Sequence, residues 1–349
     1  MKYLLQTILL GFALSVFAHG GTVSIADFGA IPDDNIDDSN SIQEAVYKLQ
    51  TQGGGTLVFP EGVWDVRREI DFSTSNNYIS YKLLGDKGSE IVVSAGPEAT
   101  VFYFGNQNQV IVENLIITGK KAPASDMIDC KYLFYFDNVS QRFLRGMEIY
   151  GVFATGALVY TGTGTTVIEN SIFGGNGTHN ASVVAFNSSL SVINTNFIDY
   201  ANYKDEHFSK TYVNGGAWIK TDSNSVVEDA YGQRVVRITD SRFDEGARIA
   251  IQIANAAHVA ISGINVNVSG MDDARGIELS NVENAEINFS WFGLTTVARP
   301  AIVALNRTTL EITALKFGAA VYFADIDSTS AVSAKFCPQC ESSLRRTKK

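Results

Sequence analysis

Cysteine, basic residues and long apolar runs are scarce in this sequence, and each shortage excludes a class of protein. Three cysteines in 349 residues cannot form a disulfide-stapled scaffold. Lys and Arg number 27 against 37 Asp and Glu, and the formal net charge is −10. Nucleic acid is therefore not expected as a partner, because phosphate binding needs a basic surface. Beyond the N-terminal segment, no apolar run is long enough to span a membrane.

The cysteines that are present do not predict a metal centre. Cys130 lies beside an apolar segment, where we expect it to be a small buried hydrophobe. Cys337 and Cys340 form a C-x-x-C pair, which is half of a zinc site at most. In an oxidising compartment a local disulfide or an unreactive pair is the simpler interpretation. We predict no resident metal ligands in this chain.

The N-terminus is expected to direct secretion. Lys2 precedes an apolar stretch from Leu4 to Leu14, and Val16 and Ala18 supply the small residues that signal peptidase requires. We predict a signal peptide over residues 1–18 and a location that is extracellular or periplasmic. Seven glycosylation sequons follow, and they would be used only in a eukaryotic secretory host. They begin at Asn138, Asn176, Asn180, Asn187, Asn267, Asn288 and Asn306.

Two short phrases recur in alternation along most of the chain. Clear copies of the first are FYFGN at 102–106, FYFDN at 134–138, IQIAN at 251–255, IELSN at 277–281 and IVALN at 302–306. Copies of the second include VIVEN at 110–114, TVIEN at 166–170, VVRIT at 235–239, HVAIS at 258–262 and LEITA at 310–314. Apolar residues at every second position, followed by Asn or Gly, predict strands and turns.

The spacing of the repeat predicts a solenoid. Successive Asn residues of the first phrase lie 26 residues apart from Asn255 to Asn281 and 25 apart from Asn281 to Asn306. Such a period, in two or three strands per turn, is typical of a β-helix, and the fixed leucine framework of a leucine-rich repeat is missing. We expect one all-β domain over 19–335, a right-handed parallel β-helix of about eight to ten coils. A basic tail with the C-x-x-C pair would follow at 336–349.

Two features interrupt the regular pattern. Ser41 and Glu44 form a capping box for a helix over 41–52 that would close the first coil, and Gly53 would end it. Farther on, the second phrases near Asn194 and Thr239 are separated by about two periods. We interpret this as one coil with two long loops, 199–216 and 224–234, and long loops on a rigid stack often carry binding sites.

The segment from Ala26 to Asp65 resembles the N-terminal signature of the pectate-lyase-like β-helix superfamily, which includes polygalacturonases, rhamnogalacturonases and phage tailspikes. The resemblance rests on DFGA at 27–30, PDDNIDDS at 32–39, GGGT at 53–56 and FPEG at 59–62. It implies the β-helix fold and makes a polysaccharide the expected partner. The acidic residues of this signature are expected to be cap residues and not catalysts: Asp33, Asp34, Asp37 and Asp38.

The motifs of an orthodox polygalacturonase are missing. The chain has no G-H-G, only Ile219-Lys220-Thr221 echoes the R-I-K element, and the pair Asp272-Asp273 follows it in the wrong order. The resemblance therefore implies the architecture more strongly than it implies this activity.

Aligning the coils by their Asn residues predicts which side chains point outward. One outward column contains Tyr103, Tyr135, Val184, Lys220, Gln252, Glu278 and Val303. Asp222 follows Lys220 in a second outward column. Because neighbouring coils lie about 4.8 Å apart, Lys220 and Glu278 would lie about 10 Å apart with Gln252 between them. We predict a site at this place.

Other residues are expected to complete this site. The loop 199–216 contributes Tyr203, Lys204 and His207, and aromatic faces with a few polar groups suit a sugar. Arg248, Arg275 and also Arg242 are candidates for a uronate carboxylate. Tyr135 either contacts a sugar or stacks on Tyr103 to stabilise the coil.

Two mechanisms fit these groups. In a lyase Lys220 would be the base, with Arg248, Arg275 or a cation such as Ca²⁺ neutralising the carboxylate. In a glycoside hydrolase Asp222 and Glu278 would be the carboxylate pair. We predict a secreted enzyme that degrades an extended, acidic polysaccharide. The alternative is a non-catalytic glycan-binding or structural surface protein, and the sequence leaves the oligomeric state open.

Overall fold

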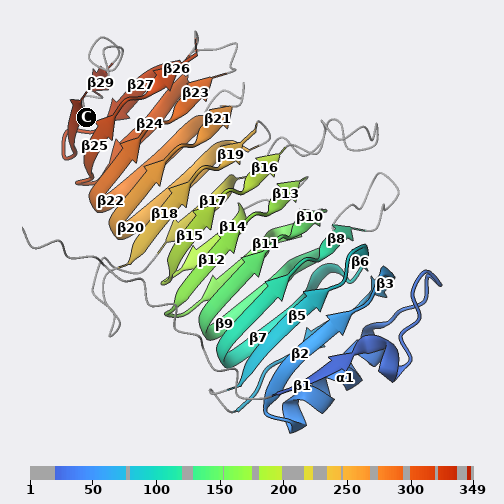
Figure 1. Cartoon of the computed structure of the whole chain (residues 1–349). Coiled ribbons are helices and arrows are strands. Elements are labelled where there is room, and N and C mark those ends of the chain that lie inside the picture. The colour runs from blue at the N-terminus through green and yellow to red at the C-terminus, as the bar shows by residue number, and fades with distance from the viewer. Residues whose placement is uncertain are drawn as a thin grey trace, which may run out of the picture.

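The computed structural model shows an elongated stack of parallel strands, and the predicted right-handed parallel β-helix with an N-terminal capping helix is confirmed (Figure 1). The structure describes residues 20–75, 79–119, 129–151, 153–174, 181–198, 216–222, 234–244, 247–267, 274–293, 299–318, 321–335 and 344–346. Within these residues the strands form a 19-stranded and a 10-stranded sheet, and in both sheets neighbouring strands pair in parallel.

The larger sheet bends into two faces, and the smaller sheet forms the third. The first face contains β4 (Ile70–Asp71), the first halves of β7 (Gly96–Glu113), β9 (Cys130–Arg145), β20 (Ile249–Ser262) and β22 (Arg275–Asn288), and β11 (Phe153–Thr161), β14 (Ala181–Phe186), β17 (Ala217–Asp222), β24 (Arg299–Leu305), β27 (Val321–Ile326) and β29 (Leu344–Arg346). The second face contains the second halves of the long strands together with β1 (Gly21–Ser24), β2 (Gly54–Phe59), β5 (Ser80–Gly85), β12 (Thr165–Glu169), β15 (Ser189–Ile193), β18 (Val235–Thr239), β25 (Thr309–Thr313) and β28 (Ala331–Lys335). The third face contains β3 (Gly62–Val66), β6 (Ser89–Val93), β8 (Ile116–Gly119), β10 (Glu148–Tyr150), β13 (Ile172–Gly174), β16 (Asn196–Ile198), β19 (Arg242–Phe243), β21 (Asn265–Asn267), β23 (Trp291–Gly293) and β26 (Lys316–Phe317).

The Asn residues of the repeat make the corner between the first and second faces. Asn255, Asn281 and Asn306 all have a φ of 54°, the left-handed conformation that Asn tolerates better than most residues. Their side chains also bond along the stack, since Asn281 Nδ2 donates to Asn255 Oδ1 at 2.7 Å. The recurring Asn therefore serves both the sharp turn and the contact between coils.

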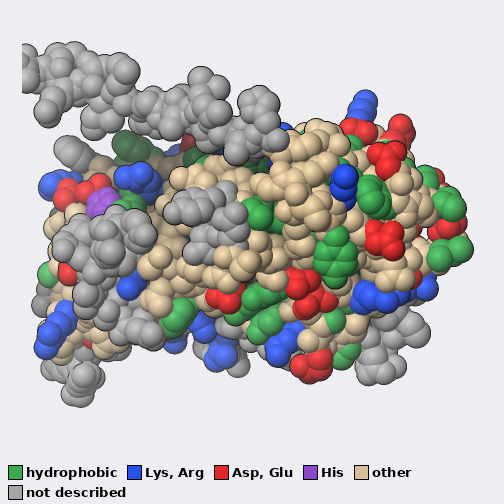
Figure 2. Space-filling model, turned by 90° about the horizontal axis from the view of Figure 1, so that it is seen from below, with side chains coloured by type: hydrophobic (Ala, Val, Ile, Leu, Met, Phe, Trp, Pro, Cys, Tyr) green, Lys and Arg blue, Asp and Glu red, His purple; other side chains and the backbone are tan. Residues whose placement is uncertain are grey.

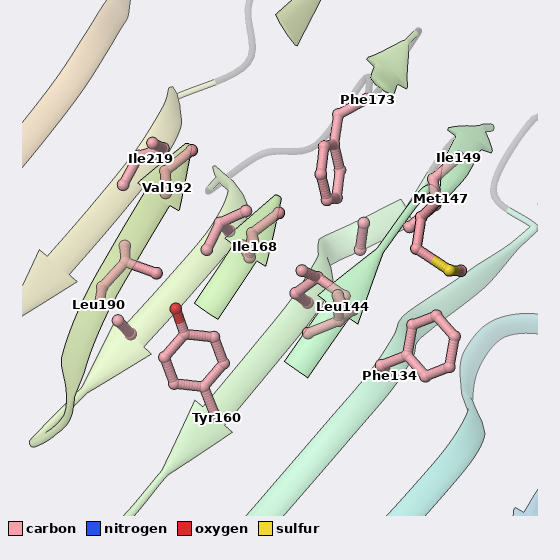
Figure 3. Packing of buried hydrophobic residues seen from close by; sticks show 14 of the residues in the cluster. Phe134, Leu144, Met147, Ile149, Tyr160, Ile168, Phe173, Leu190, Val192 and Ile219 are labelled. Carbon is pink, nitrogen blue, oxygen red and sulfur yellow. The ribbon is translucent and has the colours of Figure 1, made fainter. Parts of the chain in front are cut away.

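The core is a set of side-chain stacks inside the coils. Every second residue of a strand points inward, and the aromatic ones align from coil to coil: Phe102 lies 5.1 Å from Phe134, and Phe197 lies 4.9 Å from Phe243 between ring centroids. Leucine and isoleucine fill the space between them (Figure 3). Cys130 is buried at the start of β9, as predicted.

The N-terminal helix α1 (Ser39–Thr51) covers the first coil, and Ile42, Ala45, Val46 and Leu49 are fully buried beneath it. The predicted capping box is wrong, because Ser41 and Glu44 lie inside a helix that begins two residues earlier. Asp37 accepts a hydrogen bond from the Ser39 backbone N–H at 3.1 Å. The helix ends before Gly53, whose φ is 80°, as expected.

The acidic turn before α1 is structural, in agreement with the prediction. Asp38 accepts hydrogen bonds from the backbone N–H groups of Ile31 at 3.2 Å and Asp65 at 3.0 Å. Asp33 accepts one from Val63 at 3.1 Å, so these carboxylates fasten the turn to the first coil.

The long interval between Asn194 and Thr239 corresponds to a single coil. Strand β17 pairs with β14 on one side and with β20 on the other, and β18 likewise lies between β15 and β20. The prediction of one coil is confirmed. The two predicted loops lie outside the described residues, apart from Gly216 and Arg234. Within the expected C-terminal tail, β29 pairs with β27 and adds a further strand to the first face.

Candidate functional site on the first face

The predicted outward column exists, and the register adds Asp71, Val159, Asp325 and Arg345 to it. Tyr103 pairs with Tyr135, Tyr135 with Val159, and Val159 with Val184. The column then continues through Lys220, Gln252 and Glu278 on three consecutive strands. Val159 was missed because its coil is a weak copy of the repeat. Lys220 and Glu278 are therefore two strand spacings apart, about 10 Å, as predicted.

Glu278 is held in place by two neighbours. Gln252 Nε2 donates to Glu278 Oε1 at 2.9 Å, and Arg275 Nη1 forms an ion pair with Glu278 Oε2. Only 11% of the Glu278 side chain is exposed, against 35% for Arg275. A carboxylate bonded at both oxygens by a cation and an amide is fixed in position.

Asp222 belongs to a different local network. Asn255 Nδ2 donates to Asp222 Oδ1 at 3.1 Å, which joins Asp222 to the corner Asn residues. From the register, the Cα atoms of Asp222 and Glu278 are two strands and two residues apart, about 12 Å. Glu278 is moreover turned toward Arg275, on the side away from Asp222. Asp222 and Glu278 therefore make separate contacts, Asp222 with Asn255 and Glu278 with Gln252 and Arg275.

The predicted arginines divide between two faces. The Arg275 backbone N–H donates to the Arg248 carbonyl at 2.9 Å, so both lie at the edge of the first face, and Arg248 is exposed. Arg242 lies on β19 in the third face, where its Nε pairs with Asp244 at 3.0 Å. The expectation that Arg242 joins the site is wrong, because Arg242 lies on the two-residue strand β19 of the third face, and a corner separates that face from the first. Tyr203, Lys204 and His207 lie outside the described residues.

A second cluster on the same face contains the predicted stack of Tyr103 on Tyr135, which is confirmed, and Tyr132 and Asp137 join it. Tyr103 and Tyr135 stack with ring centroids 5.9 Å apart, and Tyr132 lies 5.0 Å from Tyr135. Tyr103 Oη donates to Asp137 Oδ2 at 3.4 Å. Burial, followed by the charge of Asp137, raises the pKa of Tyr103 above its ordinary value. Identical residues at the same position of successive repeats were the signal that predicts such a stack.

On the face that Figure 2 shows, charge of neither sign dominates. On the surface shown in Figure 2, the described Lys and Arg side chains are interspersed with Asp and Glu. Within the described residues, no group of three or more His, Cys, Asp and Glu side chains is placed to hold a metal ion. Calcium therefore stays a prediction. None of the helices in the described ranges combines the length and apolar character needed to cross a membrane.

Comparison with known proteins supports the resemblance drawn from the N-terminal signature. Residues 22–128 match the family model described as rhamnogalacturonase A/epimerase, pectate lyase-like. No curated protein matches the sequence. The resemblance to the pectate-lyase-like β-helix superfamily is thus confirmed by the family model over residues 22–128.

Solved structures share the fold at low sequence identity. PfbA, a surface adhesin of Streptococcus pneumoniae, superimposes with a TM-score of 0.62 at 14% identity, covering 90% of this chain and 91% of that one. Tailspike protein 2 of an Escherichia coli O157:H7 bacteriophage gives 0.60 at 13% identity, covering 91% of this chain. WceF of Pantoea stewartii, a glycan biofilm modifying enzyme, gives 0.52 at 14% identity over 86% of this chain. The chain spans 47% of that tailspike and 38% of WceF.

Proposed function

We propose that the first face binds an extended, uronate-containing polysaccharide and cleaves it by β-elimination. The observation that carries the proposal is the arrangement of Lys220, Gln252 and Glu278 on three consecutive strands of one outward column, with Glu278 held by Gln252 and Arg275. A cation about two strand spacings from a fixed anion, in one column along the stack, suits a charged polymer laid along it.

Lys220 is the proposed base. Its amine would take the proton from the carbon next to the uronate carboxylate, and a double bond would form in the ring as the bond to the leaving sugar oxygen breaks. The leaving oxygen would take a proton from water and depart as a hydroxyl group. Arg248, exposed at the edge of this face, would neutralise the carboxylate during the reaction. Glu278 and Gln252 would position the substrate beside Lys220.

Hydrolysis is less well supported by the same geometry. A hydrolase needs two carboxyl groups at about 5 to 9.5 Å on either side of the scissile bond. The Glu278 carboxylate is already bonded at both oxygens by Gln252 and Arg275, which makes it a poor acid or nucleophile for such a pair.

The test is to incubate the purified protein with polygalacturonate, alginate, rhamnogalacturonan and neutral glycans, with and without calcium. Reducing ends and the ultraviolet absorbance of unsaturated uronate are followed together. New ends with the absorbance are the expected result on an acidic glycan. Lys220→Ala should lower kcat by at least about 100-fold, whereas Lys316→Ala, a lysine of β26 on the third face, should leave it unchanged.

Two outcomes would contradict the assignment. New ends without the absorbance would show hydrolysis and remove Lys220 from the role of base. Equal activity of Lys220→Ala and the wild type would move the site away from this column.

Non-catalytic binding of a glycan is the second candidate function, and two observations favour it. PfbA, whose fold matches nine-tenths of both chains, is a surface adhesin. The cluster of Tyr103, Tyr132 and Tyr135 offers aromatic faces of the kind that hold sugars. Retention on a glycan array without any product formed would support this function, and Tyr135→Ala should then weaken retention.

Secretion completes the proposal. A β-helix acting on a polymer outside the cell needs a leader, and residues 1–18 have the features of one. Expression in a secreting host and N-terminal sequencing should give a mature chain that starts at His19, after cleavage behind Ala18. An intact Met1 in the medium or in the cell would contradict this.

A further inference from the structure

An arginine occupies an interior column that is otherwise mainly apolar. Arg142, in the second half of β9, pairs with Val110 on one side and Thr166 on the other, and Thr166 pairs with Leu190. Val110 and Leu190 are core residues, and Arg142 itself has no exposed surface. Its side chain therefore lies inside the coil, beneath the corner between the first and second faces.

Several polar atoms around Arg142 are buried without a hydrogen-bond partner. The guanidinium donates once, from Nη2 to Ser188 Oγ at 2.6 Å, and its carbon lies 4.9 Å from the centre of the Tyr160 ring. Arg142 Nε and Nη1 have no partner among the described residues. Tyr160 Oη and Thr166 Oγ1 are buried too, and within the described part of the chain they have no partner besides each other. Figure 3 shows the Tyr160 hydroxyl inside the core on the side of Leu190 and Ile168.

The buried guanidinium of Arg142 and the hydroxyls of Tyr160 and Thr166 are all hydrogen-bond donors. Burial lowers the pKa of Arg142 only to about 10, so the guanidinium is charged at neutral pH. Burial raises the pKa of Tyr160, so its phenol is neutral and keeps its hydrogen. Thr166 lies on the strand next to Arg142, and its side-chain hydrogen bond to the Tyr160 hydroxyl acts against burial and lowers the pKa of Tyr160. One full positive charge and two hydroxyls thus gather in one enclosed place.

An anion would satisfy this cluster of donors better than a water molecule would. Buried polar groups in native proteins nearly always have a partner, and unexplained ones point to a bound water or ion. Water would satisfy the donors but would leave the charge uncompensated, which is costly in an apolar interior. The corner also keeps space for the guanidinium, since a side chain at Gly164 would meet Arg142 Nη2 at 2.8 Å.

We propose that Arg142, Tyr160 and Thr166 form a buried site for a small monovalent anion, chloride being the natural occupant. The site lies inside the β-helix, away from the outward column, so it does not depend on the proposed enzymatic function. Its occupancy links the stability of the central coils to the halide concentration outside the cell.

The test is thermal unfolding of the full chain in sodium gluconate, with chloride or bromide replacing gluconate at constant ionic strength. The Tm should rise and then saturate, by about 3 to 6 °C once the halide exceeds its Kd about 100-fold. Arg142→Met should abolish the rise. Arg145→Met, which removes a partly exposed arginine three residues along the same strand, should keep it.

A direct measurement covers the case in which Arg142→Met does not fold. Crystals of the wild type grown in bromide should show an anomalous peak beside Arg142 Nη1 and Nε. The proposal fails if the wild-type Tm does not respond to halide. It fails equally if both arginine variants respond alike, which would be a general salt effect, or if the anomalous map shows no peak there.

Discussion

The ion pair between Arg275 and Glu278 offers the sharpest test of the proposed site, because it should make the site rigid before substrate arrives. Replacing Glu278 by Gln keeps the shape but turns an amide NH₂ or a neutral oxygen toward the guanidinium. Breaking a fully buried pair costs about 3 to 5 kcal/mol, and an exposed pair contributes about 0.2 to 1 kcal/mol. Glu278 is 11% exposed and Arg275 is 35% exposed, which places this pair between the two limits.

We therefore expect Glu278→Gln and Arg275→Met each to lower the free energy of unfolding by about 1 to 3 kcal/mol. The double variant should cost less than the sum of the singles, with a coupling energy of about 1 to 2 kcal/mol. The measurement is urea unfolding of the four proteins followed by circular dichroism, and their m-values must agree.

A coupling energy below about 0.5 kcal/mol, the error of additivity, would refute the reasoning. The pair would then be screened by solvent, and Glu278 would not be a fixed group. Gln252→Ala serves as the companion variant, because Gln252 donates to the same carboxylate from the next strand. It should show a smaller coupling to Glu278 than Arg275 does, since the amide is uncharged.

Three further predictions concern the scaffold. Asn281→Gly should change the free energy of unfolding little, whereas Asn281→Val should lower it by about 1 to 2 kcal/mol more, because the φ of 54° suits Gly but not a β-branched residue. Urea unfolding of both variants measures the difference, and an equal loss of stability in the two would contradict it. Although burial opposes it, hydrogen bonds from the Asn306 backbone and the hydroxyls of Thr329 and Ser330 lower the pKa of Asp327 to about 2. This carboxylate then stabilises the fold above its unfolded pKa, and the contribution disappears as the pH falls toward 2. Asp327→Asn should therefore flatten the dependence of Tm on pH between about 4 and 2. An unchanged slope would refute this prediction. Burial raises the pKa of the Cys130 thiol. In a variant with Cys337 and Cys340 replaced by Ser, a thiol reagent should therefore label the protein only after unfolding. Labelling of the native protein would contradict this.

The repeat made much of the architecture predictable. An Asn at the end of each first phrase marks a left-handed corner, and alternation of apolar residues decides which side chains point inward. Because each coil pairs in register with the next, aligning the phrases placed Lys220, Gln252 and Glu278 in one column. The N-terminal boundary of α1 was not predictable in the same way, since Asp37 and Asp38 bond to residues of the first coil about thirty positions away.

The local sequence thus determined the solenoid, its corners and the order of residues along each column, because these follow from short-range backbone preferences repeated coil after coil. Which columns become a site was decided only by tertiary structure. The bonds of Gln252 and Arg275 to Glu278, and the separation of Asp222 from it, depend on side chains from different coils. Arg142 shows the same limit: no local pattern marks an arginine as interior, and only the closed coil encloses its charge among Tyr160, Thr166 and Ser188.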